Sequence, residues 1–239
     1  MSRELVVHAD RAALVAETAD RFVTTVDAVL AERGECHVAL TGGSVGIELL
    51  GALRGRSLDW SRVHCWWGDE RFVPATDGER NALQAREALL DHVDIPSSNV
   101  HEMPASDAGL DLDAAAAAAT SDLGDRALDL VLLGMGPDAH VASLFPGYDG
   151  TDVEETGVIA VRHSPKPPPE RLSLTFGSLN RAARVWLVVA GDDKASALAL
   201  AMSTADRHEV PAAGVHGTIE TRYLVDRSAT SLLPDGMLG

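Results

Sequence analysis

The sequence is most informative over the stretch Cys36-His-Val-Ala-Leu-Thr-Gly-Gly-Ser-Val-Gly46. Its first five residues are an apolar run typical of a buried strand, and a helical pattern follows over residues 45–53. A glycine turn between a strand and a helix can hold a phosphate, because backbone N–H groups approach the anion closely and the helix N-terminus favours negative charge. The residues expected to bind the phosphate are Thr41, Gly42, Gly43 and Ser44.

The same turn fits a second pattern, the G-x-S-x-G sequence of serine hydrolases, in which Ser44 would be the nucleophile. That motif normally follows an upstream strand and an oxyanion loop, whereas only about 40 residues precede Ser44 and none of them form His-Gly-Gly-Gly. A strand-to-helix turn without any ligand is a third interpretation. The phosphate-binding interpretation is favoured over both.

Short β-branched runs alternate with Ala- and Leu-rich stretches of helical period along the rest of the chain. This alternation predicts an α/β fold with a mostly parallel, Rossmann-like open sheet and helices on both faces. Residues 1–239 are expected to form a single domain, and the proline-rich segment 164–170 is expected to be a loop between two of its strands. Expected strands are residues 36–40, 63–67, 128–133, 157–161, 171–175, 185–190 and 222–225, and expected helices are residues 11–33 with Asp10 as N-cap, 45–53, 79–92, 112–123 and 194–202.

Composition limits the classes of function. The 239 residues include 20 Lys and Arg against 36 Asp and Glu, a formal net charge of −16, and no Lys- or Arg-rich run. Nucleic acid and anionic membrane surfaces are therefore disfavoured as partners. Cys36 and Cys65 lie in apolar runs without ligand spacing, so neither a disulfide nor a zinc site is expected. The sequence has no signal peptide, no apolar run near ~20 residues and an unfused end at Gly239, which predicts a stand-alone cytoplasmic protein.

Two acids and an arginine follow the Trp-rich strand at residues 63–67, in the sequence Gly68-Asp-Glu-Arg71. Open α/β sheets bind ligands at the carboxyl ends of their strands, which predicts that Asp69 and Arg71 contribute to a site. The planar guanidinium of Arg71 suits a phosphate or a carboxylate, which it can bind through two hydrogen bonds. A solvated surface ion pair is the alternative.

A third motif, Gly134-Met-Gly-Pro-Asp-Ala-His140, follows the apolar strand at residues 128–133. It partly matches a dinucleotide-binding turn, but Pro137 removes an N–H donor and no clear ribose-binding acid follows, so NAD is not expected. His140 lies two residues beyond Asp138 and is a candidate general base near neutral pH. A helix-capping or core histidine is the alternative.

The proline-rich loop carries the cations Arg162, Lys166 and Arg171. Only two lysines, Lys166 and Lys194, occur in a chain with a net charge of −16. A local cluster of cations against that background suggests anion binding, with solvated surface charges as the alternative.

Taken together, these blocks resemble a known family. Residues 41–44, 67–74 and 134–147 occur in the order and spacing of the 6-phosphogluconolactonases of the glucosamine-6-phosphate isomerase/6-phosphogluconolactonase superfamily, and residues 166–175 and 190–194 are also similar. Deaminases of that superfamily typically carry Asp-Glu-Tyr where this chain has Asp69-Glu-Arg71, and Phe-Asn-Glu-Pro-Gly where it has Ser143-Leu-Phe-Pro-Gly147. The resemblance is therefore to the lactonases.

The resemblance implies hydrolysis of 6-phospho-D-glucono-1,5-lactone to 6-phosphogluconate, a step of the oxidative pentose phosphate pathway. His140 would take a proton from water, Asp138 would orient the imidazole, and Arg71 would bind either the phosphate or the developing oxyanion. No metal or organic cofactor is implied, and a monomer or weak homo-oligomer acting on a small phosphosugar lactone is expected. The remaining residues expected to bind substrate are Thr41, Gly42, Gly43, Ser44, Asp69, Asn81, Lys166 and Arg171.

Two positions depart from the family pattern. Ala139 replaces the usual Gly, which would strain the loop by about 1–2 kcal/mol if this position has a positive φ. Arg80-Asn81 stands where Ser-Asn is usual, and Asn81 either contacts substrate or caps the following helix. The alternative functions are an isomerase or deaminase with Asp69 as base, and a sugar-phosphate-binding regulatory domain without catalysis.

Overall fold

A six-stranded parallel sheet forms the centre of the structure, a computed structural model that describes residues 3–237. All neighbouring strands in this sheet pair in parallel, as the alternating sequence pattern predicts. Most side chains of its central strands are buried, because helices cover both faces. The order across the sheet is β1 (Arg3–His8), β9 (Glu220–Asp226), β8 (Arg184–Val189), β5 (Leu130–Leu133), β2 (Cys36–Leu40) and β3 (Val63–Trp67).

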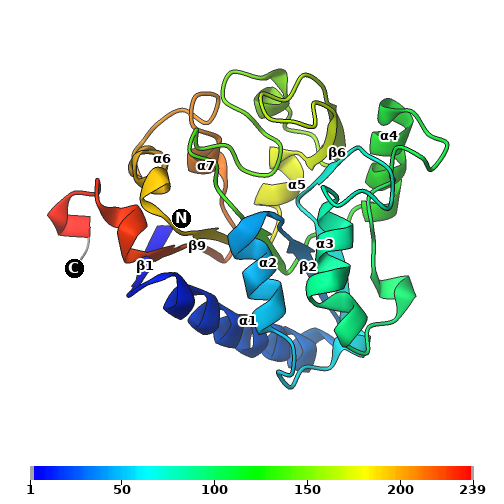
Figure 1. Cartoon of the computed structure of the whole chain (residues 1–239), viewed down its shortest axis with the longest axis horizontal. Helices are drawn as coiled ribbons and strands as arrows, with labels where there is room; N and C mark the ends of the chain where they lie inside the picture. The colour runs from blue at the N-terminus through cyan, green and yellow to red at the C-terminus, as the bar shows by residue number, and fades with distance from the viewer. Residues whose placement is uncertain (1–2, 238–239) are drawn as a thin grey trace.

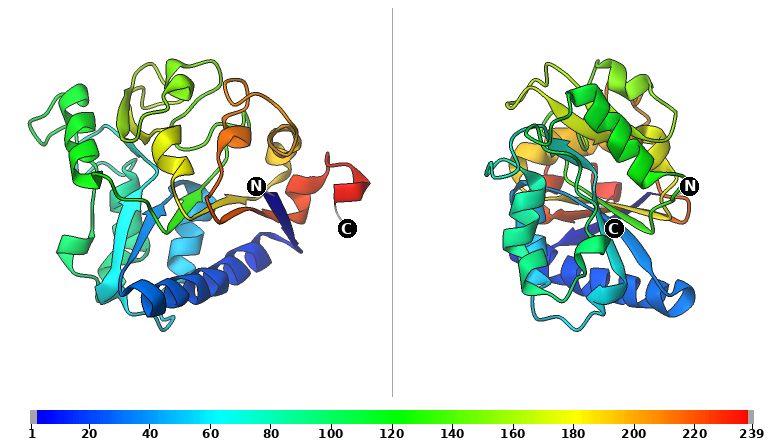
Figure 2. Two further views of the ribbon diagram at one scale, coloured as in Figure 1. Left: turned by 180° about the vertical axis from the view of Figure 1, so that it is seen from behind. Right: turned by 90° about the vertical axis from the view of Figure 1, so that its right-hand side faces the viewer.

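The two faces of the sheet are covered by different sets of helices (Figures 1 and 2). One face packs against α1 (Arg11–Arg33), α2 (Gly43–Ala52) and α3 (Asn81–Ala88), in one continuous apolar cluster. The other packs against α4 (Leu112–Leu123), α5 (Phe176–Asn180), α6 (Ala195–Ala201) and α7 (Pro211–Gly214), in a second cluster. Short 3₁₀ helices are η1 (Trp60–Arg62), η2 (Leu90–His92), η3 (Ser97–Asn99), η4 (Asp149–Asp152), η5 (Asp192–Lys194), η6 (Arg227–Thr230) and η7 (Asp235–Met237).

A second, antiparallel sheet of three strands lies beside the first, in the order β4 (Asp69–Arg71), β7 (Arg171–Leu174) and β6 (Val158–Val161). The expectation that residues 157–161 and 171–175 belong to the mostly parallel sheet is therefore wrong. Residues 162–170 between these strands are too few for a parallel crossover, which needs a dozen or more residues, so the chain returns as a hairpin. The proline-rich segment is the loop of that hairpin, as predicted.

The helix predictions hold best where capping is strong. The Asp10 side chain accepts a hydrogen bond from the Ala13 N–H at 2.8 Å, which confirms it as the N-cap of α1. Gly34 ends the same helix in a left-handed conformation. The expected helix 79–92 is instead α3 followed by η2, because Leu89 leaves the helical region with φ −145°. Strands β1 and β4 were not expected from the sequence.

Both cysteines are buried and unpaired by disulfides, as expected. Burial raises the pKa of the Cys65 thiol to about 12, and burial together with Asp129 raises that of Cys36, so neither is a reactive thiolate near neutral pH. Within residues 3–237, no helix has the length and apolar character needed to cross a membrane. The expected domain also includes residues 1–2 and 238–239, which lie outside the described part of the chain.

The loops that carry the three motifs meet at one edge of the parallel sheet. Strand β2 lies between β3 and β5, and the chain leaves β2 toward β3 but leaves β5 toward β8. The carboxyl ends of β2 and β5 are therefore a topological switch point, where open α/β sheets bind ligands. The Gly68 N–H donates to the Leu40 carbonyl at 3.1 Å, and the Gly134 N–H donates to Thr41 Oγ1 at 3.1 Å, which ties the loops together.

Candidate active site

A cleft of about 290 Å³ opens at this switch point. Loops after β2, β3 and β5 form one side, and the proline-rich loop between β6 and β7 forms the other. The cleft thus gathers nine of the eleven residues that the sequence pointed to, from segments far apart in the chain. These nine are Thr41, Gly42, Gly43, Asp69, Arg71, Asn81, His140, Lys166 and Arg171.

His140 and Asp138, the pair that the sequence analysis predicts to be catalytic, contact each other in the structure. His140 Nδ1 lies 2.5 Å from Asp138 Oδ1, a distance at which the ring N–H donates to the carboxylate. That tautomer leaves Nε2 without a hydrogen and able to accept one. The His140 ring also packs against Phe145, with 4.7 Å between the ring centroids. The imidazole is therefore held from two sides.

The electrostatics keep Asp138 ionised. Partial burial raises the pKa of this carboxyl, but the hydrogen bond and charge of His140 and the charge of Lys166 outweigh that effect and hold the pKa well below its usual range. Lys166 Nζ lies 3.5 Å from Asp138 Oδ1 and 3.3 Å from His140 Nδ1. Since both nitrogens carry hydrogens when His140 donates to Asp138, the carboxylate is the acceptor that both share.

Two residues of the turn that holds this pair, Gly136 and Ala139, are restricted in the side chain they can carry. A Cβ on Gly136 would lie 2.0 Å from His140 Nδ1 and 2.3 Å from Asp138 Oδ1, so only glycine leaves space for their hydrogen bond. Ala139 has φ 63°, the left-handed conformation for which a glycine is the usual residue. The strain expected from this Ala therefore applies, and burial of its methyl group offsets part of it.

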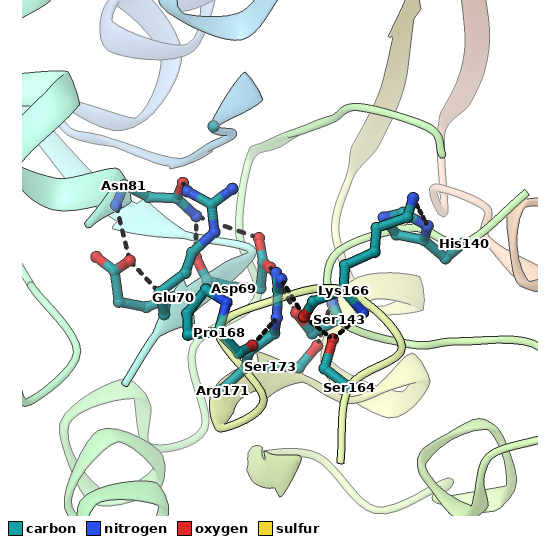
Figure 3. A network of polar contacts seen from close by, with 12 residues as sticks. Asp69, Glu70, Asn81, His140, Ser143, Ser164, Lys166, Pro168, Arg171 and Ser173 are labelled. Carbon is teal, nitrogen blue, oxygen red and sulfur yellow. Dashed lines mark hydrogen bonds and ion pairs between the residues drawn. The ribbon is translucent and has the colours of Figure 1, made fainter. Parts of the chain in front are cut away.

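A network of polar contacts organises the part of the cleft away from His140, where Asp69, Asn81 and Arg171 lie (Figure 3). Arg71 Nη1 donates to Asn81 Oδ1 at 2.6 Å, and Asn81 Nδ2 donates to the Asp69 carbonyl at 2.8 Å. The Asp69 carboxylate accepts a hydrogen bond from Ser143 Oγ at 2.6 Å and lies 3.9 Å from Arg171 Nη1. The Asp69 carboxylate is thus held in place by Ser143 and Arg171 through Oδ2.

Two cations of this part of the cleft differ in their hydrogen-bond partners. Arg71 lines the cleft, and its buried Nε has no hydrogen-bond partner within residues 3–237. Arg171 instead donates to the carbonyls of Lys166, Pro167 and Pro168, at 3.0–3.2 Å, and so fixes the proline-rich loop. Burial lowers the pKa of the Arg171 guanidinium, which Asp69 partly offsets, and it remains charged at neutral pH.

Ser44 and Asp138 are the two expected residues that do not line the cleft. Asp138 lies behind His140 as its partner, whereas Ser44 is exposed and lines an adjoining cavity of about 130 Å³ with Lys194. No histidine or carboxylate within residues 3–237 forms a hydrogen bond with Ser44. A serine nucleophile needs such a base, so the interpretation of this turn as the nucleophile motif of a serine hydrolase is disfavoured.

Comparison with known proteins agrees with this geometry. Residues 9–223 match the family model described as glucosamine-6-phosphate isomerases/6-phosphogluconolactonase. The chain belongs to this family. It is 46% identical to the 6-phosphogluconolactonase of Streptomyces coelicolor, over 97% of this chain and 95% of that one, and 47% identical to that of Mycobacterium tuberculosis, over 98% and 100%. The crystal structure of the 6-phosphogluconolactonase from Thermotoga maritima superposes with a TM-score of 0.85 at 28% identity, covering 95% and 100%.

The structure adds three residues that the sequence analysis did not assign to the site. Lys194 lines both cavities, Ser143 donates to Asp69, and Gly136 leaves space for the His140–Asp138 pair. Lys194 had a signal in the sequence, since it is one of only two lysines in the chain. Ser143 and Gly136 lie within the motifs at residues 134–147, but their roles could not be predicted because they depend on contacts formed only in the folded loop.

A group of possible metal ligands lies outside the cleft. Glu35, His37 and His64 bring ligand atoms within 4.8 Å of one another at the amino ends of β2 and β3, the edge opposite the cleft. However, His37 Nδ1 accepts a hydrogen bond from the Trp66 indole N–H at 3.1 Å. Its Nε2, 3.4 Å from Glu35 Oε1, therefore carries the hydrogen in the neutral ring. Ligating histidines normally donate from their second nitrogen, so these residues do not fit a metal centre.

Proposed function

We propose that this family member hydrolyses 6-phospho-D-glucono-1,5-lactone to 6-phosphogluconate in the oxidative pentose phosphate pathway. The observation that carries the proposal is the His140–Asp138 pair, 2.5 Å apart, beside a cleft lined by Arg71, Lys166 and Arg171. A lactone with a phosphate needs a base for water and cations for the phosphate, and the cleft offers both. The 6-phosphogluconolactonase relatives support the same substrate.

In the proposed mechanism His140 acts first as a base. Its Nε2 removes a proton from a water molecule as the water oxygen forms a bond to C1 of the lactone, and the carbonyl oxygen becomes an oxyanion. Asp138 accepts the Nδ1 hydrogen throughout, which orients the ring and stabilises its charged form. His140 then returns the proton to the ring oxygen as the C1–O bond breaks. The product acid loses a proton to solvent.

The cations of the cleft have two tasks in this mechanism, to bind the phosphate and to stabilise the oxyanion. Arg71 brings a positive charge to the cleft beside Asn81, and Lys166 lies next to the catalytic pair. Either group can neutralise the phosphate or the oxyanion, and together with the α2 N-terminus at Gly42 and Gly43 they offset the negative field of an acidic chain. Binding energy at the phosphate holds C1 beside His140.

The contacts that the Asp69 carboxylate makes favour the lactonase over the isomerase or deaminase alternative. An enediol mechanism would use Asp69 as its base, whereas here Asp69 Oδ2 already accepts a hydrogen bond from Ser143 and lies against the Arg171 guanidinium. A sugar-phosphate sensor without catalysis would need the cations but not a water-activating imidazole next to a carboxylate. We also propose that residues 1–239 form one lactonase domain that works in the cytoplasm as a monomer or weak homo-oligomer.

The test is a coupled assay with the purified protein. Glucose-6-phosphate dehydrogenase generates the lactone in place, and excess 6-phosphogluconate dehydrogenase reports its opening through NADPH. We expect a catalytic amount of protein to accelerate the second NADPH phase above spontaneous opening. An unchanged second phase with folded protein would reject the lactonase, and release of ammonia from glucosamine-6-phosphate would then favour the deaminase.

A further inference from the structure

The buried acid Glu70 has no part in the mechanism above, yet it lies between two residues of the cleft. Its side chain is 1% exposed and comes from the centre of β4, pointing away from the cleft toward the start of α3. Oε1 accepts hydrogen bonds from the backbone N–H groups of Arg71 and Asn81, each at 2.7 Å. Oε2 accepts a third from the Ala82 N–H at 2.8 Å. One carboxylate thus joins β4 to α3.

Helix α3 depends on this carboxylate for its N-terminus. The first N–H groups of a helix have no partner within the helix, and the N-cap residue Arg80 supplies no side-chain acceptor. Glu70 satisfies two of these groups, at Asn81 and Ala82, from a different element and places a negative charge where the helix favours one. The start of α3 is therefore fixed relative to β4 and not only by its own sequence.

The charge of Glu70 is balanced without involving the cleft. Arg80 Nη2 lies 3.7 Å from Glu70 Oε2 and donates to the Met103 carbonyl at 2.8 Å, so the guanidinium is anchored on the far side of the carboxylate. A buried carboxylate with a cationic partner and three N–H donors has a single favourable position. This makes Glu70 a rigid spacer between the residues it contacts.

The two residues that share Glu70 Oε1 also meet through their side chains. Arg71 Nη1 donates to Asn81 Oδ1 at 2.6 Å on the cleft side, while their backbone N–H groups converge on Oε1 behind. The separation of the two backbones is therefore set by one oxygen atom. If that atom moves or loses its acceptor character, the Arg71 guanidinium loses its alignment.

We propose that Glu70 is a positioning residue, which sets the placement of Arg71 and Asn81 and through them the affinity for the anionic substrate. The inference deepens the proposed function and rests on it, since it assigns to Arg71 an anion of the lactone or its product. Glu70 itself contacts neither water nor substrate in this scheme. Its effect should consequently pass through the Arg71–Asn81 contact.

The test combines Glu70→Gln with Asn81→Ala in a double-mutant cycle. In Glu70→Gln an NH₂ group replaces one of the two acceptor oxygens and faces backbone N–H donors, so the start of α3 must shift. We expect each single variant to lower kcat/KM by about tenfold, and the double variant to lose about tenfold rather than about a hundredfold, because both disturb the same Arg71–Asn81 contact. A carboxylate that only supported the fold would give losses that multiply. Multiplying losses, or unchanged kcat/KM in Glu70→Gln, would overturn the proposal.

Asp129→Asn is the matched control. Asp129 is 2% exposed, accepts a hydrogen bond from the His37 N–H at 2.9 Å and pairs with Arg33, all at the sheet edge away from the cleft. The same acid-to-amide change there should lower the midpoint of thermal unfolding and leave kcat/KM unchanged. An equal loss of kcat/KM in Asp129→Asn would show that general destabilisation, and not positioning, explains Glu70→Gln.

A second variant and a second measurement test the positioning role if Glu70→Gln does not fold or if the protein does not open the lactone. If Glu70→Gln does not fold, Glu70→Asp, which retains the charge but retracts it by one methylene, replaces it in the cycle. If the wild-type protein does not open the lactone, the proposed function fails, and the positioning is read from the ¹H–¹⁵N signals of the Asn81 side-chain amide, assigned with Asn81→Ala. Those signals should move in the Glu70 variant and not in Asp129→Asn; no movement would reject the positioning.

Discussion

Gly136→Ala should disable the catalytic pair without disturbing the rest of the fold. The added Cβ would lie 2.0 Å from His140 Nδ1, 2.1 Å from Cε1 and 2.3 Å from Asp138 Oδ1. Reaching an ordinary 3.4 Å contact requires a displacement of about 1.4 Å of the imidazole or the carboxylate. Misplacing a catalytic group by about 1 Å costs about 10²-fold in rate, so we expect kcat to fall by about 10²- to 10³-fold.

The assay for this variant is steady-state lactone hydrolysis together with thermal unfolding. Gly51→Ala is the control, because it makes the same chemical change in α2 at a position where a Cβ would have no heavy atom within 4 Å. It should leave kcat unchanged. A kcat for Gly136→Ala within threefold of the wild-type value, in protein that unfolds at the same temperature, would refute the assignment of the His140–Asp138 pair.

Three other predictions follow from the site. Asp138→Asn should lower kcat by about 10²- to 10⁴-fold, because an amide cannot hold the same tautomer of His140. In the wild type, the pH dependence of kcat between pH 5 and 9 should show no ionisation of Asp138, since its depressed pKa keeps this carboxyl charged throughout this range. For the same reason the stability that Asp138 contributes is present above the ordinary pKa of an aspartate and is lost only as the pH falls through its lower folded value, so acid unfolding monitored by circular dichroism should begin at higher pH in Asp138→Asn. Gly42→Ala, whose Cβ would lie 2.0 Å from Asn81 Oδ1, should raise KM about tenfold by breaking the contact between Asn81 and Arg71, and an unchanged KM would count against that contact. Ser44→Ala should raise KM only modestly, and an organophosphonate should label neither this variant nor the wild-type protein. Loss of kcat in the variant, or labelling of Ser44 in the wild type, would instead support Ser44 as a nucleophile.

Much of the fold could be predicted from local signals. The glycine turn after residues 36–40, the N-cap at Asp10 and the apolar strands each depend on neighbours in the sequence, and each is found in the structure. Strand β4 could not be predicted, because its three residues Asp-Glu-Arg carry no apolar pattern and pair only with β7, about a hundred residues later. The break at Leu89 likewise has no proline or glycine beside it in the sequence to signal it.

The candidate site shows the same division. Arg71, Asp138 and His140 could be predicted because they lie in short motifs that follow apolar strands. The structure brings Arg71 and His140 to one cleft and places Asp138 next to it. Their supporting residues could not be assigned in this way. Ser143 and Glu70 lie inside motifs that the sequence analysis quotes, but their roles could not be predicted because they act through hydrogen bonds to partners that the fold supplies.

The most direct test of the account compares His140→Ala with the wild-type protein in the coupled lactone assay, with the dissociation constant of 6-phosphogluconate measured by titration calorimetry on the same samples. The account predicts that kcat falls by about 10²- to 10⁴-fold while the dissociation constant stays within about threefold, because the base is lost and the cations remain. Wild-type turnover in His140→Ala would contradict it.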